Sequence, residues 1–564
     1  MTLKRNILAS YACQLYVAII GIVVVPLYLT YMGAEAYGLV GFFTMLQAWF
    51  NLLDMGLTPT MARETARFRG GATAALSYRR LVRALEGVFL VVALAGGGAM
   101  FAASSYIANN WLQVVHLPVA EVQGAVHLMA VIVAMRWMGG LYRSAISGSE
   151  RLVWLGGYNA CIATMRFIGV LPVLIFVGAT PTIFFSYHCG VAVLELGGLL
   201  FQAYCLLPLI PQGKRLPWSW APLKPVLKFS LTIAFTSSVW ILVTQTDKLV
   251  LSKLLPLAEY GYFTLAVLIA GGVMVISGPI SGAIMPRMAK LEAEGDHTGL
   301  IRVYRQSTQL VAVIVGAASI TVAFCAEPLL WAWTGDKILA HQAAPMLILY
   351  AIGNGILAVS AFPYYLQYAK GDLRLHLIGN AVFVLLLVPA IIWAASQYGG
   401  VGAGYVWLVM NLISFVAWLP LVHRKFAPGL NLKWYVQDIL TIFVVAGIVG
   451  YCLYTILPHS DSRGWQIGAV MGFGLLVLMA GSIASAFVRE SFCTLITGTS
   501  NGKRGKERAR MIDLDAPGVI IFFGTMNAMP MMYAHELRNL GQDVIYFVDV
   551  PEKNALCRPE NHFP

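Results

Sequence analysis

Charged residues within long apolar segments of this chain define the chemistry that those segments could support. The candidates are the cationic Arg136, Arg166 and Lys248 and the anionic Asp54, Glu195 and Asp247. A charge inside a bilayer is costly, so each is a functional candidate by default. A guanidinium group has a planar fork of N–H donors that can hold two phosphate oxygens at once. We therefore predict that the cations bind an anionic substrate and that the acids couple an ion to the process.

Each candidate also has a structural interpretation. Arg166 and Glu195 fall on successive apolar segments and could form an ion pair that stabilises the bundle. Lys248 lies near the end of its segment, where a lysine can extend its ammonium group to the interface. Asp54 precedes the turn Gly56–Pro59 and could cap it. The sequence leaves these alternatives open.

The elements that position these residues must be membrane helices. The chain has 564 residues, of which 59% are hydrophobic and 11% charged, whereas a soluble domain carries about 25% charged residues. Apolar runs of roughly 20 residues predict about fourteen transmembrane helices. Lipid offers the backbone no hydrogen-bond partner outside a helix or a closed barrel. We therefore predict an all-α polytopic membrane protein.

The basic residues predict the orientation of the chain. Lys and Arg gather in the N-terminal segment and in alternate loops, while the opposite loops hold Lys253, Lys337 and Arg463. Because Lys and Arg accumulate in cytoplasmic loops, both termini are predicted to be cytoplasmic. The same distribution accounts for the net charge of +12 without a nucleic-acid partner.

Short motifs occur twice in the chain, and the two copies of each motif are separated by the same number of residues. Tyr37-Gly38 recurs as Tyr260-Gly261, and Gly148-Ser-Glu-Arg recurs as Gly371-Asp-Leu-Arg. Each pair falls at the same place in the count of helices. We therefore predict two pseudo-symmetric six-helix lobes plus two extra helices. The lobes should be related by an axis along the membrane normal, with a site between them.

The chain is predicted to consist of an N-terminal six-helix lobe (1–208), a C-terminal six-helix lobe (209–433), helices 13 and 14 (434–489), a basic cytoplasmic linker (490–515) and a short βαβ-like cytoplasmic tail (516–564). The tail should hold strands at Val519–Phe523 and Asp543–Val548 with a helix at Met529–Leu540 between them. A unit of this length cannot bury a complete Rossmann core.

No catalytic constellation is present. A Walker loop, G-x-S-x-G and H-E-x-x-H are absent, and the eight cysteines include no C-x-x-C spacing. We therefore predict no catalytic residues, no metal and no cofactor. A membrane-embedded polymerase or ligase would need a sizeable outward loop rich in acids or arginines, whereas the predicted outward loops are all short.

Two stretches carry a family resemblance. Pro26-Leu-Tyr-Leu-Thr-Tyr-Met-Gly-Ala-Glu-Ala-Tyr37, continuing at Leu53–Glu64, resembles the opening of Wzx-type polysaccharide transporters of the multidrug/oligosaccharidyl-lipid/polysaccharide superfamily. Thr246–Leu255 and Glu259–Ala266 resemble the matching opening of the second half. The resemblance covers residues 1–490. In the tail, Ile520–Gly541 resembles the first strand–helix unit of a two-Rossmann, nucleotide-sugar glycosyltransferase.

The resemblance implies a function. Such a protein would flip an undecaprenyl-diphosphate-linked oligosaccharide, an O-antigen or exopolysaccharide repeat unit of polysaccharide or lipopolysaccharide biosynthesis, from the cytoplasmic to the periplasmic leaflet of the bacterial inner membrane by alternating access. The implied partners are this polyprenyl-diphosphate-linked glycan, membrane lipids, and polysaccharide polymerase and chain-length machinery. The alternative is a multidrug or cation antiporter of the same superfamily, which should show acids outweighing bases in its cavity.

Overall fold

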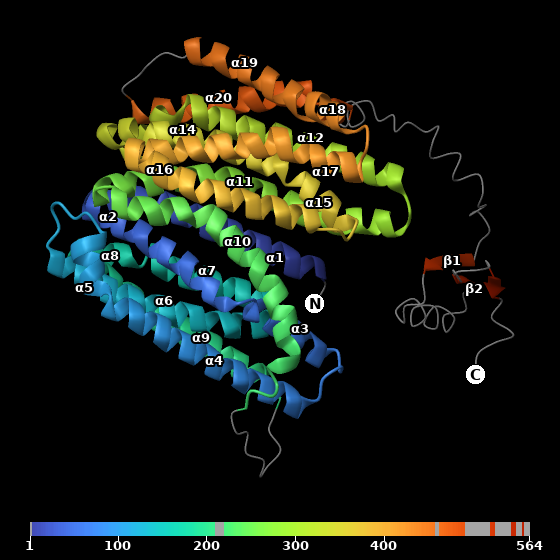
Figure 1. Ribbon diagram of the computed structural model, residues 1–564, viewed down its shortest axis with the longest axis horizontal. Helices are drawn as coiled ribbons and strands as arrows, with labels where there is room; N and C mark the ends of the chain where they lie inside the picture. The colour runs from blue at the N-terminus through green and yellow to red at the C-terminus, as the bar shows by residue number, and fades with distance from the viewer. Residues whose placement is uncertain are drawn as a thin grey trace. The chain divides into compact units, whose positions relative to one another are not determined.

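The computed structural model describes residues 3–208, 219–456 and 462–490, together with the strand residues 519–524, 543–548 and 555–557. The chain divides into two units, Met1–Arg489 and Glu490–Pro564. The first unit is a bundle of long helices (Figure 1).

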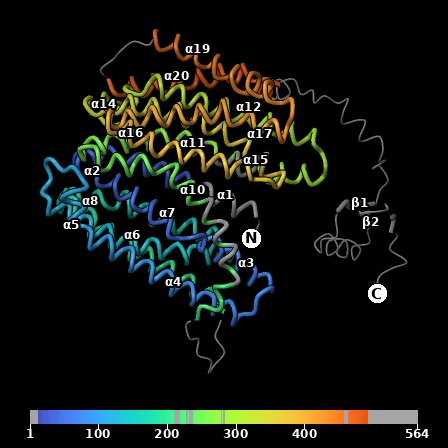
Figure 2. Tube along the Cα trace, in the orientation of Figure 1, coloured from blue at the N-terminus to red at the C-terminus, as the bar shows by residue number. Residues whose placement is uncertain are grey.

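The bundle consists of two halves, drawn in blue to cyan and in green to orange (Figures 1 and 2). The first half contains α1 (Leu3–Val23), α2 (Val25–Phe50), η1 (Asn51–Asp54), α3 (Leu57–Arg69), α4 (Ala75–Ala102), α5 (Ser104–Tyr106), η2 (Ile107–Trp111), α6 (Val119–Gly148), α7 (Leu152–Phe167), α8 (Val170–Phe176) and α9 (Pro181–Leu206). The second half contains α10 (Lys224–Leu254), α11 (Leu257–Ala293), α12 (His297–Phe324), α13 (Ala326–Thr334), α14 (Lys337–Ser360), α15 (Phe362–Ala369), α16 (Arg374–Ile413), η3 (Ser414–Trp418), α17 (Leu419–Phe426), α18 (Asn431–Lys433), η4 (Trp434–Leu440), α19 (Thr441–Ile456) and α20 (Arg463–Ala484).

Two of these helices turn back sharply at a glycine. Within α2, Gly33 has a φ of 82°, and within α16, Gly399 has a φ of 56°. Both angles lie in the left-handed region that glycine adopts without a steric penalty. Each element is therefore two helices that meet at a tight turn. The sequence predicts span ends at these two places.

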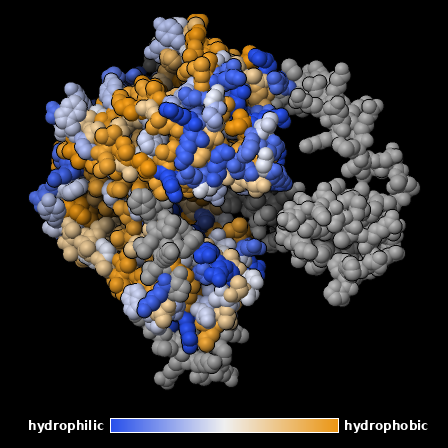
Figure 3. Space-filling view, turned by 45° about the vertical axis from the view of Figure 1, so that its right-hand side comes forward, coloured by the Kyte–Doolittle hydropathy of each residue, from blue (hydrophilic) through white to orange (hydrophobic). Residues whose placement is uncertain are grey.

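The predicted all-helical polytopic fold is confirmed for the bundle. Among the described residues, eleven helices are long and apolar enough to cross a membrane. Apolar side chains cover much of the surface seen in Figure 3, and Phe176, Leu385 and Ile483 are each more than half exposed. Such a surface would cause aggregation in water, whereas lipid matches it. The chain is a multi-pass membrane protein, and the number of fourteen spans stays a prediction.

The two halves meet along α2 and α11, which pack on each other. A side chain at Gly38 would collide with the backbone oxygen of Leu257, and a Cβ at Gly261 would lie 2.7 Å from the backbone oxygen of Ala34. These contacts are reciprocal at the repeat offset, because Gly38 corresponds to Gly261 and Ala34 to Leu257. A two-fold interface produces contacts of this kind. The repeated Tyr-Gly motifs thus face each other across the interface, and the lobe boundaries stay a prediction.

The last helices of the bundle are fixed to α12, on which α19 and α20 pack. Asp438 in η4 is fully buried and accepts hydrogen bonds from Arg305 Nε at 2.7 Å and Nη2 at 2.9 Å. Gln309 Nε2 donates to the same carboxylate at 2.7 Å. A bidentate arginine–carboxylate pair is stronger than a neutral hydrogen bond, so this cluster holds the extra helices on the second half.

The second unit contains a three-stranded sheet in the order β1 (Val519–Gly524), β2 (Asp543–Val548), β3 (Ala555–Cys557). β1 pairs with β2 in parallel, with Val519 opposite Asp543, and β2 pairs with β3 in antiparallel fashion. β1 and β2 coincide with the two predicted strands, whereas β3 was not predicted. The predicted helix at Met529–Leu540 and the linker residues 491–515 lie outside the described residues.

Candidate anion-binding site

A cavity of about 570 Å³ lies within the first half of the bundle. Its walls come from α1, the end of α2 and the start of η1, α6, α7 and α9, and no residue of the second half is among its described lining. The sequence places the site between the two halves. The difference arises because α1 packs along α7 and encloses the space inside the first half.

Three arginines share the carboxylate of Glu195 at this cavity. Arg166 Nη2 lies 2.8 Å from Glu195 Oε2, and Arg143 Nη2 lies 2.7 Å from Oε1. Arg136 Nε lies 3.6 Å from Oε2. The side chains of Arg136 and Glu195 are 11% and 7% exposed. Three guanidinium charges against one carboxylate leave the cluster with a net positive charge.

Several donors of this arginine cluster (Arg136, Arg143 and Arg166 around Glu195) have no acceptor. Arg136 Nε and Nη2, Arg143 Nε and Arg166 Nε are buried and have no hydrogen-bond partner among the described residues. Arg136 is otherwise held by Gln47, whose Oε1 accepts from Nη1 at 3.1 Å. A buried donor without an acceptor is costly. A ligand rich in oxygen acceptors, such as a phosphate, would satisfy these groups.

The backbone around the cluster is fixed by a contact between α7 and α9. The hydroxyl of Tyr158 donates to the backbone oxygen of Leu194 at 2.7 Å, next to Glu195. A Cβ at Gly198 would collide with this hydroxyl. The glycine therefore allows Tyr158 to reach α9, and this contact fixes the distance between the helices that carry Arg166 and Glu195.

Arg143 was not predicted as a site residue, because the sequence assigns it to a cytoplasmic loop. α6 continues to Gly148, so Arg143 is still helical. Arg136 and Arg143 are about two turns apart on one helix, and side chains at that spacing point the same way. The helical spacing between Arg136 and Arg143 was the signal that could have identified Arg143 as a site residue.

Asp54 lies outside the lining of the cavity. Its carboxylate accepts hydrogen bonds from the backbone N–H of Thr58 at 3.2 and 3.3 Å and from the Thr58 hydroxyl. Asp54 therefore caps the first turn of α3, as the structural interpretation of the sequence proposes. Its predicted role in ion coupling stays a prediction.

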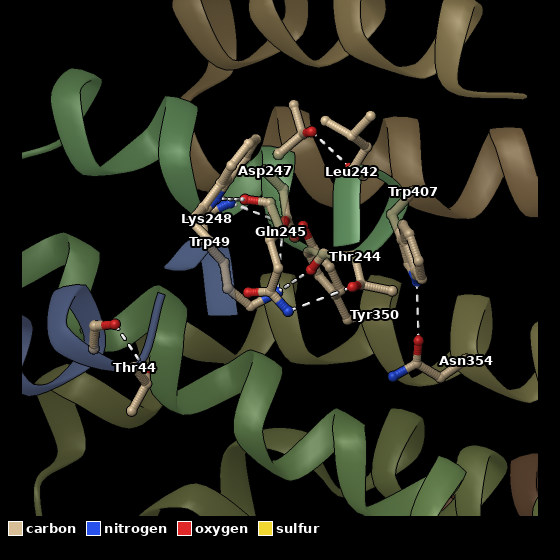
Figure 4. A network of polar contacts seen from close by, with 12 residues as sticks. Thr44, Trp49, Leu242, Thr244, Gln245, Asp247, Lys248, Tyr350, Asn354 and Trp407 are labelled. Carbon is tan, nitrogen blue, oxygen red and sulfur yellow. Dashed lines mark hydrogen bonds and ion pairs between the residues drawn. The ribbon is translucent and has the colours of Figure 1, made fainter. Parts of the chain in front are cut away.

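Asp247 and Lys248 form a separate network on α10 (Figure 4), and neither residue lines the cavity of the arginine cluster. Tyr350 OH donates to Asp247 Oδ2 at 2.6 Å, and Lys248 Nζ lies 3.4 Å from Asp247 Oδ1. Lys248 Nζ also donates to the backbone oxygen of Thr244 at 2.6 Å. The structure therefore brings Arg136, Arg166 and Glu195 together and places Asp54, Asp247 and Lys248 elsewhere.

Metal ligands do not gather in the part of the chain that the structure describes. No group of three or more His, Cys, Asp or Glu side chains there is placed to hold a metal ion.

The bundle matches the solved structure titled "Lipid II flippase MurJ, inward closed conformation" with a TM-score of 0.68, over 86% of this chain and 100% of that chain, at 14% sequence identity. The bundle has the fold of a MOP-superfamily transporter. An inward-facing multidrug resistance MATE family transporter of the MOP superfamily also matches, with a TM-score of 0.52, over 76% of this chain and 97% of that chain, at 12% identity. The family described as "Polysaccharide biosynthesis protein" matches residues 163–341. No curated protein sequence matches the chain. The fold agrees with the predicted resemblance to transporters of this superfamily, and the family match extends over residues 163–341.

Proposed function

We propose that this MOP-fold protein is a flippase that moves a polyprenyl-diphosphate-linked oligosaccharide across the bacterial inner membrane by alternating access. The observation that carries the proposal is the arginine cluster in the cavity of the first half. The match to a polysaccharide biosynthesis family and the fold shared with a lipid II flippase support it.

The electrostatics of the cavity favour a diphosphate head group. Such a group carries at least two negative charges, and the arginine cluster has a net charge of the opposite sign. Its oxygens can accept from the buried nitrogens of Arg136, Arg143 and Arg166 that have no other acceptor. Charge-assisted hydrogen bonds of this kind are about twice as strong as neutral ones. Glu195 then holds the arginines in place when the cavity is empty.

The dimensions of the cavity suit a head group rather than a whole lipid. About 570 Å³ lies within the range of small-molecule sites, roughly 300–1,000 Å³. The polyprenyl chain is as apolar as the lipid around it and has no reason to leave the bilayer. The protein therefore has to lower the barrier for the polar head alone.

The direction of transport and the coupling ion belong to the same proposal. The distribution of Lys and Arg predicts that both termini are cytoplasmic, and we propose that the substrate enters from the cytoplasmic leaflet. Asp247, which is 2% exposed, is the acid we assign to ion coupling, because it lies apart from the arginines that bind the substrate. The glycan is an O-antigen or exopolysaccharide repeat unit.

An antiporter of cationic drugs is the second candidate, because a MATE transporter shares the fold. A cationic substrate needs a cavity in which acids outweigh bases. The described cavity has the reverse balance, with Glu195 against the three arginines of the cluster. This balance favours the flippase.

The proposal is tested by Arg136→Gln and Arg166→Gln in cells that lack the wild-type gene. Each variant should lower flipping about tenfold or more, because it removes charge-assisted hydrogen bonds to the diphosphate. The lipid-linked repeat unit should then accumulate on the cytoplasmic face. Arg69→Gln is the matched control, since Arg69 donates to the backbone oxygen of Leu206 outside the cavity. Full flipping by both cavity variants at normal expression would remove the arginine cluster from the mechanism.

A further inference from the structure

Glu35 is a buried acid that lies outside the arginine cavity. It is 8% exposed and lies on α2, just after the turn at Gly33. Its carboxylate accepts hydrogen bonds from three consecutive backbone N–H groups: Val115 at 2.6 Å, His116 at 3.0 and 3.1 Å, and Leu117 at 3.1 Å. A carboxylate that binds several amides is held strongly. Glu35 therefore fixes the conformation of the loop before α6.

The same loop binds the second half of the bundle. The backbone oxygen of Gln113 accepts a hydrogen bond from the backbone N–H of Leu257 at 2.9 Å. Its side-chain amide donates to the backbone oxygens of Lys253 at 3.0 Å and Leu254 at 3.2 Å. Trp111 Nε1 donates to Ser252 Oγ at 3.0 Å. Both segments lie at the left-hand end of the helices in Figure 1.

We propose that Glu35 and Gln113 form an outer latch, which joins the loop 111–117 of the first half to the turn 252–257 of the second. The name refers to the side of the membrane that the basic residues predict to be periplasmic. The latch holds this side closed and must break before a substrate can leave there. Glu35 is a positioning residue in this device, since it acts by presenting Gln113.

The contacts are suited to reversible closure. The latch consists of hydrogen bonds at helix ends, which water can replace when the halves part. It lies next to the glycine contact between α2 and α11, where Gly38 and Gly261 leave no side chain to unpack. Closure there depends on the polar bonds of Glu35 and Gln113 and on close backbone packing.

The second half does not repeat the latch contact, although the neighbouring glycine contact between α2 and α11 is reciprocal. At the repeat offset, Gln113 corresponds to Asp336, whose carboxylate instead caps its own helix α14 by accepting from Ile338 N at 2.8 Å and Leu339 N at 3.0 Å. Asp336 therefore does not supply a second copy of the contact. A change at Glu35 or Gln113 is therefore not compensated by an equivalent contact from the second half.

Hydrogen–deuterium exchange of the full chain in lipid nanodiscs tests the proposal without a substrate. Glu35→Gln should raise amide exchange about tenfold in the segment 112–118, because it loses charge-assisted bonds. It should also raise exchange in the segment 252–258 of the other half, where the Leu257 amide is bound by the backbone oxygen of Gln113. Gln113→Ala keeps the backbone oxygen that binds the Leu257 amide but removes both side-chain bonds to the turn. It should therefore raise exchange in 252–258 by loosening the turn, while the amides held by Glu35 stay protected.

The control is Glu121→Gln, a change on the same side of the bundle. Glu121 accepts from the Thr182 hydroxyl at 2.6 Å within the first half, so exchange in 252–258 should not change. Unchanged exchange at 252–258 in both Glu35→Gln and Gln113→Ala would overturn the latch. That result would leave the flippase proposal standing, because the latter is decided by the arginine variants.

Transport gives a second readout, which rests on the proposed function. A weakened latch lowers the population that is open to the cytoplasmic leaflet, and apparent affinity falls by that fraction. Glu35→Gln should therefore raise the substrate concentration for half-maximal flipping. A variant that lowers only the maximal rate, with no change in this concentration, would contradict the latch.

Discussion

Glu195→Gln removes the negative charge that three arginines share while it keeps the length of the side chain. The Arg166 and Arg136 pairs are mostly buried, with arginine side chains 22% and 11% exposed. Arg143 is 38% exposed, so water screens its pair and its loss costs little, about 0–1 kcal/mol. Removing one partner of a buried pair costs about 3–5 kcal/mol. Because glutamine keeps one acceptor oxygen, we expect the lower end, about 3 kcal/mol.

The same variant should bind anions more tightly. Without the carboxylate, the three guanidinium charges are uncompensated, and a bound anion no longer meets a like charge. Removing one unit charge about 4 Å away changes the binding energy by about 1–4 kcal/mol between water and a protein-like medium. We therefore expect inorganic diphosphate to bind Glu195→Gln at least roughly fivefold more tightly than the wild type.

Two measurements in nanodiscs check this reasoning. Thermal unfolding without anions should show Glu195→Gln less stable than the wild type, and calorimetric titration should show it binding diphosphate more tightly. Glu86→Gln is the control, since Glu86 accepts from the neutral hydroxyls of Tyr142 at 3.3 Å and Tyr204 at 2.9 Å. An amide oxygen accepts equally well from a hydroxyl. If Glu195→Gln lost stability without gaining affinity for diphosphate, the cluster would be a structural ion pair and not an anion site.

Three further predictions concern the scaffold. Gly38→Ala should destabilise the protein by about 1–3 kcal/mol in thermal unfolding, because its Cβ would meet backbone across the interface, whereas Gly98→Ala, with no atom within 4 Å of the added Cβ, should not. Asp438→Asn should cost about 1.5–3 kcal/mol, and a double-mutant cycle with Arg305→Gln should show that the two losses are not additive. The pKa of Asp372 is lowered because a neighbouring lysine ammonium donates to its carboxylate, so its stabilising effect is complete at neutral pH and disappears as the pH falls through the folded-state pKa. The difference in melting temperature between wild type and Asp372→Asn should therefore shrink on acidification.

The sequence predicts the fold well because lipid simplifies the problem. Long apolar runs can only be helices in a bilayer, and the glycine turns at Gly33 and Gly399 lie where the predicted spans end. The tail strands were also predictable, since Val519–Phe523 is an apolar run of β-branched and aromatic residues. The short β3 was not, because three residues carry no periodicity.

The candidate site was only partly predictable. Arg136, Arg166 and Glu195 stand out because a charge in an apolar run has no other explanation than a partner or a ligand. Arg143 was missed because it lies where the apolar run ends, and hydropathy alone cannot tell the last helical turn from a loop. Lys248 was grouped with the arginines by charge. The network around its neighbour Asp247 includes Tyr350, a tertiary contact that one sequence does not reveal.

The interface motifs are repeated in both halves, whereas the arginine cluster is not, and the two features meet different physical requirements. At the offset that relates Gly148 to Gly371, Arg136 corresponds to Val359 and Arg143 to Leu366, which are 1% and 0% exposed. The second half thus has apolar core residues where the first half has two members of the arginine cluster. Motifs at the interface are repeated because both halves must contribute the same surface to a two-fold contact. Charges need not be repeated, because a second positive cavity would require its own anions or a further desolvation cost. Under the proposed function, one half binds the substrate, while the other supplies the matching surface against which it moves.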